Sequence, residues 1–231
     1  MRTIFQTAGN PGRPALLLAL LSGTYSEPED FVRAGFAAAV RAHGINADVV
    51  MAGTRAAWFA DGSIVRRIRE SVVEPAQARG NTRIWLAGVS LGGLATLLYA
   101  ARHEPDLAGI LLISPYPGTR DVLREMEAAG GLPCWHPVIP PEGDPEREAW
   151  MWLAASRNNG HAPVHCYFAA DDRFASGQRL MAGAVDPTRV RELPGGHDWE
   201  TWSVLWNTFL VDHKAALLGL RLVTLDQAID P

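Results

Sequence analysis

The sequence predicts an α/β fold, in which helices cover both faces of a mostly parallel, twisted β-sheet. Apolar runs of strand length alternate with segments of helical periodicity along the 231 residues. The apolar runs are nearly continuous, which is typical of strands that are buried on both faces of a parallel sheet. No run approaches the 18 or more apolar residues that a membrane-spanning helix needs.

Seven segments are predicted as strands. The first is expected at an edge of the sheet, and in chain order they are residues 4–7, 15–21, 47–51, 83–89, 107–114, 163–170 and 190–193. The second of them superficially resembles a secretory signal, because Arg2 and Arg13 precede it. It is short for a signal and no Ala-x-Ala pattern follows it, so we expect a buried strand.

The first helix is predicted from Ser26, which forms a capping-box pattern with Glu29, to Gly44, which closes it. Its apolar face is expected to hold Val32, Phe36, Ala39 and Val40.

Three further helices follow from the same periodicity. The second places Ile64, Ile68 and Val72 on one stripe and is expected to be kinked or ended by Pro75. The third follows residue 90, and the last carries core aromatic and apolar residues at Trp202, Leu205, Trp206, Phe209 and Leu210.

Residues 1–231 are predicted to form one domain with a small cap or flap insertion at about residues 116–162. Two short helical patterns, residues 119–129 and 146–155, interrupt the alternation there and are separated by a proline-rich loop. We interpret this segment as a flap over a site.

Composition excludes some partners and favours a reducing compartment. The net charge is −4 and no run of Lys and Arg offsets it, which argues against a nucleic-acid surface. Cys134 and Cys166 are too few for a zinc site, and we expect two reduced thiols in a cytoplasmic protein, with a bridge between them as the alternative. The oligomeric state does not follow from the sequence.

The segment Gly88-Val89-Ser90-Leu91-Gly92 matches the pattern GxSxG between a strand and a helix. A serine on such a tight corner needs strained backbone angles, and glycines two positions away leave room for the neighbouring backbone. The corner also places Ser90 at a helix N-terminus, where free amides favour negative charge. We therefore expect a nucleophile. A glycine-rich turn without function is the alternative, and the absence of GxGxxG or a Walker lysine disfavours phosphate binding.

Two further groups suit the same chemistry. His197 follows two glycines on a loop before the last helix, where an imidazole can reach a hydroxyl. Asp171 and Asp172 follow the sixth strand, where a carboxylate can orient that imidazole. Nucleophile, acid and base thus come in the order Ser90, Asp172, His197, each after the carboxyl end of a strand, where catalytic groups collect.

Nearly the whole chain resembles a small serine esterase or thioesterase of the α/β-hydrolase superfamily. The resemblance rests on GVSLGG, FAADDRF and PGGHDWETW, at the places where that family keeps its nucleophile, acid and histidine. Its acid usually lies three residues after a small residue that closes the strand, which is Ala169 here and implies Asp172, with Asp171 as the alternative. Asp198 is expected to cap the last helix instead.

The resemblance also implies the rest of the site. The flap is expected between the predicted strands at residues 107–114 and 163–170, which are the sixth and seventh strands in the family's own count. An oxyanion hole would use the backbone amides of Leu91 and Thr24, although Ser22 precedes Gly23 where the family usually has His-Gly. No cofactor or metal is required.

The implied activity is hydrolysis of a small-molecule ester with a small or medium acyl group through an acyl-enzyme. A thioesterase acting on carrier-bound or coenzyme A acyl groups, an acyltransferase or perhydrolase, and a non-catalytic binding protein on the same fold stay open as alternatives. An apolar acyl pocket could be walled by flap and loop aromatics, although core packing explains each equally well: Trp58, Phe59, Trp135, Trp150 and Trp152.

Overall fold

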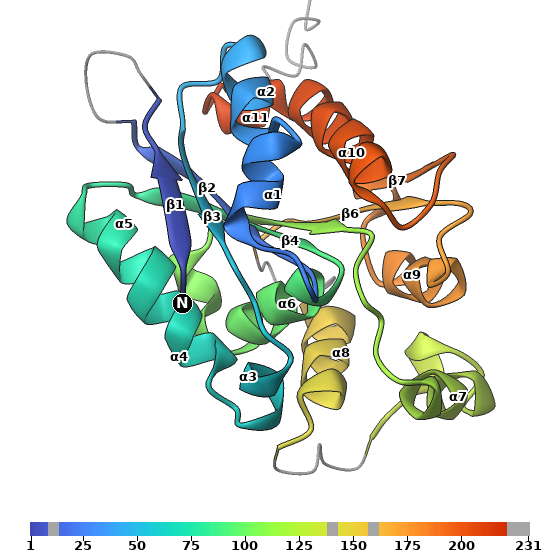
Figure 1. The fold of residues 1–231 in the computed structure, drawn as a ribbon. Coiled ribbons are helices and arrows are strands. Elements are labelled where there is room, and N and C mark those ends of the chain that lie inside the picture. Colours follow the sequence, from blue (N-terminus) through green and yellow to red (C-terminus); the bar gives the residue numbers. More distant parts are fainter. Residues whose placement is uncertain (9–13, 138–142, 157–161, 221–231) are drawn as a thin grey trace, which may run out of the picture.

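A seven-stranded sheet runs through the centre of the computed structural model, which describes residues 1–8, 14–137, 143–156 and 162–220 (Figure 1). The strand order is β1-β3-β2-β4-β5-β6-β7, and only β1 runs antiparallel to its neighbour. All seven predicted strands are present: β1 (Thr3–Gln6), β2 (Leu16–Leu21), β3 (Asp48–Ala52), β4 (Arg83–Val89), β5 (Gly109–Ile113), β6 (Val164–Ala169) and β7 (Val190–Leu193). The predicted α/β class is thus confirmed.

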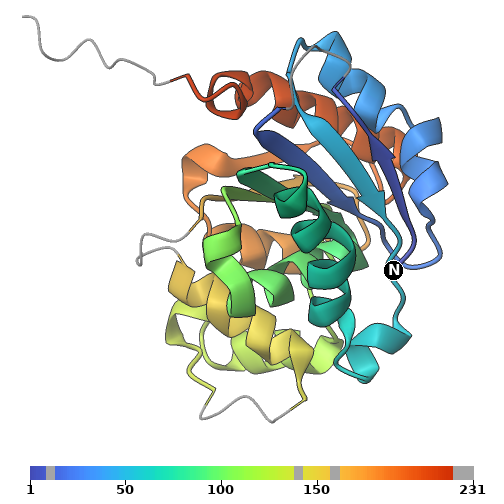
Figure 2. The same cartoon turned by 90° about the vertical axis from the view of Figure 1, so that its left-hand side faces the viewer.

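Helices cover both faces of the sheet (Figures 1 and 2). One face packs against α1 (Pro28–Arg33), α2 (Phe36–Ala42), α10 (Trp199–Asp212) and α11 (Lys214–Leu217). The core on the other side of the sheet includes side chains of α3 (Ala57–Ala60), α4 (Ile64–Ile68), η1 (Arg69–Val73), α5 (Glu74–Ala78), α6 (Leu91–His103), α7 (Arg120–Ala128), α8 (Pro145–Ser156) and α9 (Ala175–Gly183). Of these, α6 packs on the central strands and α8 packs on α6. Three single turns complete the described elements: η2 (Glu104–Asp106), η3 (Leu132–Cys134) and η4 (Pro187–Arg189).

The sequence of β2 is apolar throughout because both sides of this strand are buried. Alternate side chains of a strand point to opposite faces, and both faces of this sheet are covered. Leu17, Ala19 and Leu21 therefore join one core cluster, while Leu16, Leu18 and Leu20 join the other, and all are buried.

The first predicted helix is two helices, which corrects its start and its apolar face. α1 begins at Pro28, and Glu27 and Asp30 form the capping box that was expected from Ser26 and Glu29. Gly35 takes a left-handed φ of 76° and separates α1 from α2. The break changes the helical phase.

Val32 is consequently 41% exposed, whereas Phe31 takes its expected place in the core. Phe36 and Val40 are buried as predicted, and Gly44 closes α2 with a φ of 67°.

The helix that carries Ile64, Ile68 and Val72 buries all three, as predicted. It does not end at Pro75, because α5 contains Pro75 in its first turn and continues to Ala78, directly after the π-turn η1. A π-turn removes the regular i to i−4 bonding that a proline would interrupt.

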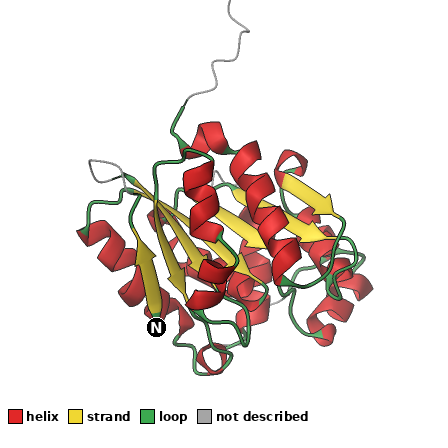
Figure 3. Ribbon diagram, turned by 45° about the horizontal axis from the view of Figure 1, so that its top comes forward, coloured by secondary structure: helices red, strands yellow, loops and turns green. Residues whose placement is uncertain are grey.

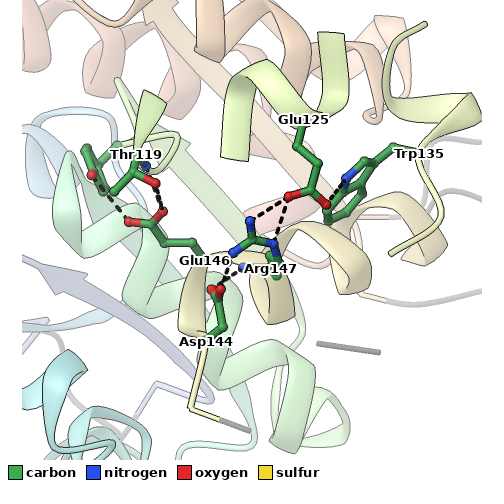
Figure 4. Close-up of polar contacts among 7 residues, drawn as sticks. Thr119, Glu125, Trp135, Asp144, Glu146 and Arg147 are labelled. Atoms are coloured by element: carbon green, nitrogen blue, oxygen red, sulfur yellow. Dashed lines mark hydrogen bonds and ion pairs between the residues drawn. The ribbon is translucent and has the colours of Figure 1, made fainter. Parts of the chain in front are cut away.

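The predicted insertion lies between β5 and β6, the fifth and sixth strands of this chain, and the two expected helices are α7 and α8. Arg147 on α8 joins them, because its guanidinium donates to Glu125 of α7 at 3.0 Å and pairs with Asp144 (Figure 4). Glu125 also accepts from the Trp135 indole at 2.9 Å. Residues 138–142 of the proline-rich loop and residues 157–161 after α8 lie outside the described residues.

No helix in the described ranges is long and apolar enough to cross a membrane. Cys134 and Cys166 are both free thiols, as expected. Cys166 is fully buried in the core, and this burial raises the pKa of its thiol to about 12.

Candidate active site

Ser90 occupies the corner between β4 and α6 with a φ of 53° and a ψ of −119°. A side chain rarely adopts this backbone conformation, and the neighbouring glycines make it possible. A Cβ at Gly88 would lie 2.1 Å from the carbonyl oxygen of Gly92, and a Cβ at Gly92 would lie 2.2 Å from that of Leu21. The GxSxG pattern is therefore a steric requirement of this turn.

Five loops meet beside Ser90 because they all follow the carboxyl ends of parallel strands. They follow β2, β4, β5, β6 and β7, whose arrows run side by side in one sheet (Figure 3). Backbone bonds join them: the Ser90 amide donates to Ile113 at 3.1 Å, and the Tyr116 amide donates to the Ser90 carbonyl at 2.9 Å.

Ser90, His197 and Asp172 form one continuous chain of hydrogen bonds. His197 Nε2 lies 2.9 Å from Ser90 Oγ, and its Nδ1 lies 2.7 Å from Asp172 Oδ2. The Ser90 and Asp172 residues are only 8% and 5% exposed. Asp171 is exposed and its side chain makes no hydrogen bond with His197, so the geometry favours Asp172 over the alternative acid.

Asp172 is held in its charged form. Burial alone would raise the pKa of this carboxyl, but hydrogen bonds from His197, the Phe174 amide and Gln178 outweigh burial and lower it below its usual range. An ionised Asp172 stabilises a positive charge on His197.

Gln178 on α9 is a site residue that sequence reasoning missed. Its fully buried amide nitrogen donates to Asp172 Oδ2 and to the Pro115 carbonyl, each at 3.1 Å. It therefore connects the end of β5 to the acid that follows β6. No local pattern marks it, since α9 itself was not predicted.

His197 is packed more tightly than a glycine-rich loop suggests. Its ring lies edge-to-face between Phe174, at 5.2 Å, and Trp202, at 5.0 Å. Gly195 takes a φ of 129°, and a Cβ there would lie 2.7 Å from Thr201 Oγ1. Asp198 caps α10 through the Thr201 amide, as predicted. The imidazole is thus oriented by contacts with two aromatic rings as well as by Asp172.

Ser22, which stands where the family usually has histidine, anchors the loop after β2. Its hydroxyl donates to Ser26 at 2.9 Å and accepts from the Thr54 amide at 3.1 Å. Thr54 Oγ1 in turn donates to the Ser22 carbonyl at 2.5 Å. Gly23 must stay small, because a Cβ there would lie 3.1 Å from Ser90 Cβ.

The two predicted oxyanion donors border the same cavity as Ser90. Leu91 is the first residue of α6, so its amide precedes the bonding ladder of the helix. Thr24 lies on the loop that Ser22 anchors, next to Tyr25, whose φ is 62°. Both positions suit an amide that faces an oxyanion, and their role stays a prediction.

A cavity of about 450 Å³ opens above Ser90. Tyr116, Phe174 and Trp202 give it an aromatic wall, and Ala56 and the loop after β2 complete it. Tyr116 is the contribution of the predicted flap, and its hydroxyl lies 3.4 Å from Glu146 of α8, which also binds Thr119 at the start of α7 (Figure 4).

The aromatics considered for an acyl pocket do not line this cavity. Trp150 is fully buried and its indole donates to the Pro117 carbonyl at 2.7 Å. Phe59 is buried and Trp152 and Trp58 pack against the same core cluster, the last under the guanidinium of Arg67. Trp135 borders a separate cavity between η3, α8 and α9. All five side chains pack in or against one core cluster, and none of them borders the cavity above Ser90.

Among the residues that the structure describes, no group of three His, Cys, Asp or Glu side chains is placed to hold a metal ion.

Many solved structures share this architecture at low sequence identity. Est1E from Butyrivibrio proteoclasticus superposes with a TM-score of 0.65 at 16% identity, covering 92% of this chain and 94% of that one. FphF, a fluorophosphonate-binding serine hydrolase of Staphylococcus aureus, gives 0.64 at 15% identity over 89% and 86%. A monoacylglycerol lipase of Paleococcus ferrophilus gives 0.56 at 16% identity over 92% and 100%.

The chain has the α/β-hydrolase fold. Neither a protein-family model nor a curated protein matches the sequence. The resemblance stated from three short motifs thus extends to the whole architecture. In this α/β-hydrolase fold, the loops after β2, β4, β6 and β7 bring together Ser90, Asp172 and His197 with the two predicted oxyanion positions, Leu91 and Thr24.

Proposed function

We propose that this protein is a serine hydrolase that cleaves a carboxylic ester through an acyl-enzyme intermediate. The observation that carries the proposal is the bonded chain of Ser90, His197 and Asp172 at the edge of an open cavity. A hydroxyl that is bonded to an imidazole, which a carboxylate orients, is the arrangement required for nucleophilic catalysis by serine.

In the first half-reaction, Ser90 Oγ attacks the ester carbonyl while His197 Nε2 takes the hydroxyl proton. The carbonyl oxygen becomes an oxyanion, for which the amides of Leu91 and Thr24 are the proposed donors. The intermediate collapses, the ester C–O bond breaks, and His197 gives its proton to the departing alcohol.

In the second half-reaction, water replaces the alcohol. His197 removes a proton from the water as it attacks the acyl carbonyl, and then returns that proton to Ser90 Oγ. The carboxylic acid leaves and the enzyme is restored. Ionised Asp172 stabilises the imidazolium in both halves without accepting its proton.

The size of the cavity supports a small or medium acyl group. Its volume of about 450 Å³ falls in the lower part of the range of ligand pockets. Among the described residues, the flap helices α7 and α8 contribute no side chain to its lining. A cytoplasmic location and a small-molecule substrate are part of the same proposal.

Turnover of a chromogenic short-chain ester by Ser90→Ala tests the proposal. We expect the kcat of this variant to fall by about 10⁵-fold or more, because triad residues act as a unit. Ser71→Ala, on η1 and away from the cavity, is the matched control and keeps the activity. A Ser90→Ala variant with unchanged kcat would refute the assignment, and a preference for thioesters over esters would favour the thioesterase.

A further inference from the structure

Arg173 brings a positive charge to the cavity above Ser90. It directly follows Asp172, is exposed, and lines the cavity together with Phe174 and His197. Its guanidinium lies 4.8 Å from the centre of the Phe174 ring, and the same ring contacts His197. Phe174 thus contacts both the guanidinium and the reacting imidazole.

No carboxylate in the described part of the chain pairs with Arg173. Other arginines nearby do have acidic partners: Arg55 pairs with Glu27 at 3.6 Å, and Arg179 pairs with Glu192 at 2.5 Å. The remaining cavity lining is neutral or, at His197, titratable. Arg173 is thus the one permanently charged side chain among the residues that line this cavity.

We propose that Arg173 binds an anionic group of the substrate, a carboxylate or a phosphate that lies a few atoms from the ester carbonyl. The inference rests on the proposed ester hydrolysis and adds the substrate class to it. A guanidinium offers planar pairs of N–H donors that match the oxygens of either anion. Stacking on Phe174 restricts the side chain before binding, which reduces the entropy that binding would otherwise lose.

The test compares two esters that differ in one charge. The first is mono-4-nitrophenyl glutarate, whose acyl group ends in a carboxylate, and the second is its methyl ester, which is neutral. The quantity measured is the ratio of kcat/KM for the charged ester to kcat/KM for the neutral one, within each variant. Because both values come from the same sample, the ratio does not depend on the folded fraction.

We expect Arg173→Gln to lower this ratio by about five-fold or more, a size consistent with a charged hydrogen bond at an exposed site. Arg173→Lys should keep most of the ratio, because the charge remains. Arg179→Gln, which removes an arginine that does not line the cavity, should keep it fully. An equal ratio in wild-type protein and Arg173→Gln would overturn the inference while leaving ester hydrolysis intact.

A third ester, with a phosphonate in place of the terminal carboxylate, shows whether Arg173 prefers a carboxylate or a phosphate. A larger loss for this ester than for the glutarate on Arg173→Gln assigns the site to phosphate, and the reverse assigns it to carboxylate.

Binding without turnover separates failure of this inference from failure of the proposed function. Calorimetry of glutarate with Ser90→Ala, and with Ser90→Ala combined with Arg173→Gln, measures the anion site alone. We expect binding that weakens in the double variant. Equal affinity of the two variants for glutarate would overturn the anion site. If the wild-type protein turns over no ester but glutarate binding still depends on Arg173, only the proposed hydrolysis is overturned.

Discussion

Asp172 keeps its negative charge in a place where burial opposes charge. Three donors accomplish this: the imidazole of His197, the amide of Phe174 and the side chain of Gln178. Two of the three come from residues that directly follow the acid or lie on the helix after it, so the loop after β6 builds its own binding site for a carboxylate.

We predict that Asp172→Asn lowers kcat by about 10³- to 10⁴-fold, because an amide cannot hold the His197 imidazole in the required tautomer or stabilise its protonated form. Asp171→Asn is the control with the same chemical change one residue away, and it should stay within about two-fold of wild type. Steady-state kinetics on a short-chain ester distinguishes the two, and the opposite pattern would assign the acid to Asp171.

The elements that form the site show which parts of it a sequence can predict. Ser90, His197 and Asp172 were identified because each follows a strand and two of them lie in glycine patterns that the backbone requires. Gln178 and the charge of Arg173 were missed, since their roles arise only when α9 and the cavity are in place. Periodicity over a segment cannot show such contacts between distant parts of the chain.

The predicted boundaries of the first helix were wrong for a local reason. Gly35 was not recognised as a break, so one amphipathic stripe was extended across two helices and Val32 was placed in the core. The helix α3 was not predicted because four residues are too few to show a period. The helix α9 was missed because its buried residues are Ala175, Gly177, Gln178 and Met181, which do not form a clear apolar stripe. The strands were found because burial on both faces makes each of them continuously apolar.

The turn between β4 and α6 leaves no room for a side chain at Gly92. Gly92→Ala would place a Cβ 2.2 Å from the backbone carbonyl oxygen of Leu21, which cannot move without disturbing β2. We expect the free energy of unfolding to fall by about 3 kcal/mol or more, with loss of ester hydrolysis.

Gly183→Ala at the end of α9 is the matched control, because a Cβ there has no atom within 4 Å. Urea unfolding of the two variants gives the comparison. A Gly92→Ala variant as stable and active as Gly183→Ala would show that the turn is not constrained in this way.

For the whole molecule, we propose that residues 1–231 form one domain, since both core clusters pack on the same sheet.

The stability of the protein should depend on pH through a histidine far from the site. His165 on β6 is 3% exposed, packs against His213 at a ring distance of 4.1 Å, and its Nδ1 has no hydrogen-bond partner among the described residues.

Burial, followed by the positive neighbours His213 and Arg189, lowers the pKa of His165 to about 3. Between about pH 6.5 and pH 3 the unfolded chain therefore binds a proton that the folded protein excludes. Acidification through this window should lower the free energy of unfolding, by at most about 1.4 kcal/mol per pH unit from this residue.

We predict that His165→Leu makes the free energy of unfolding less dependent on pH between 6.5 and 4.5, as measured by urea denaturation. Exposed His136→Gln should leave the pH dependence as it is in the wild type. Identical slopes for His165→Leu and the wild type would contradict this assignment.

The central claim is that His197 activates Ser90 for attack. The most direct measurement is reaction of the folded protein with a fluorophosphonate, followed by mass spectrometry to locate the modified residue. We predict a single adduct on Ser90 that forms rapidly in the wild type and is strongly slowed in His197→Ala. No adduct, or an adduct on another serine while Ser90 stays free, would contradict it.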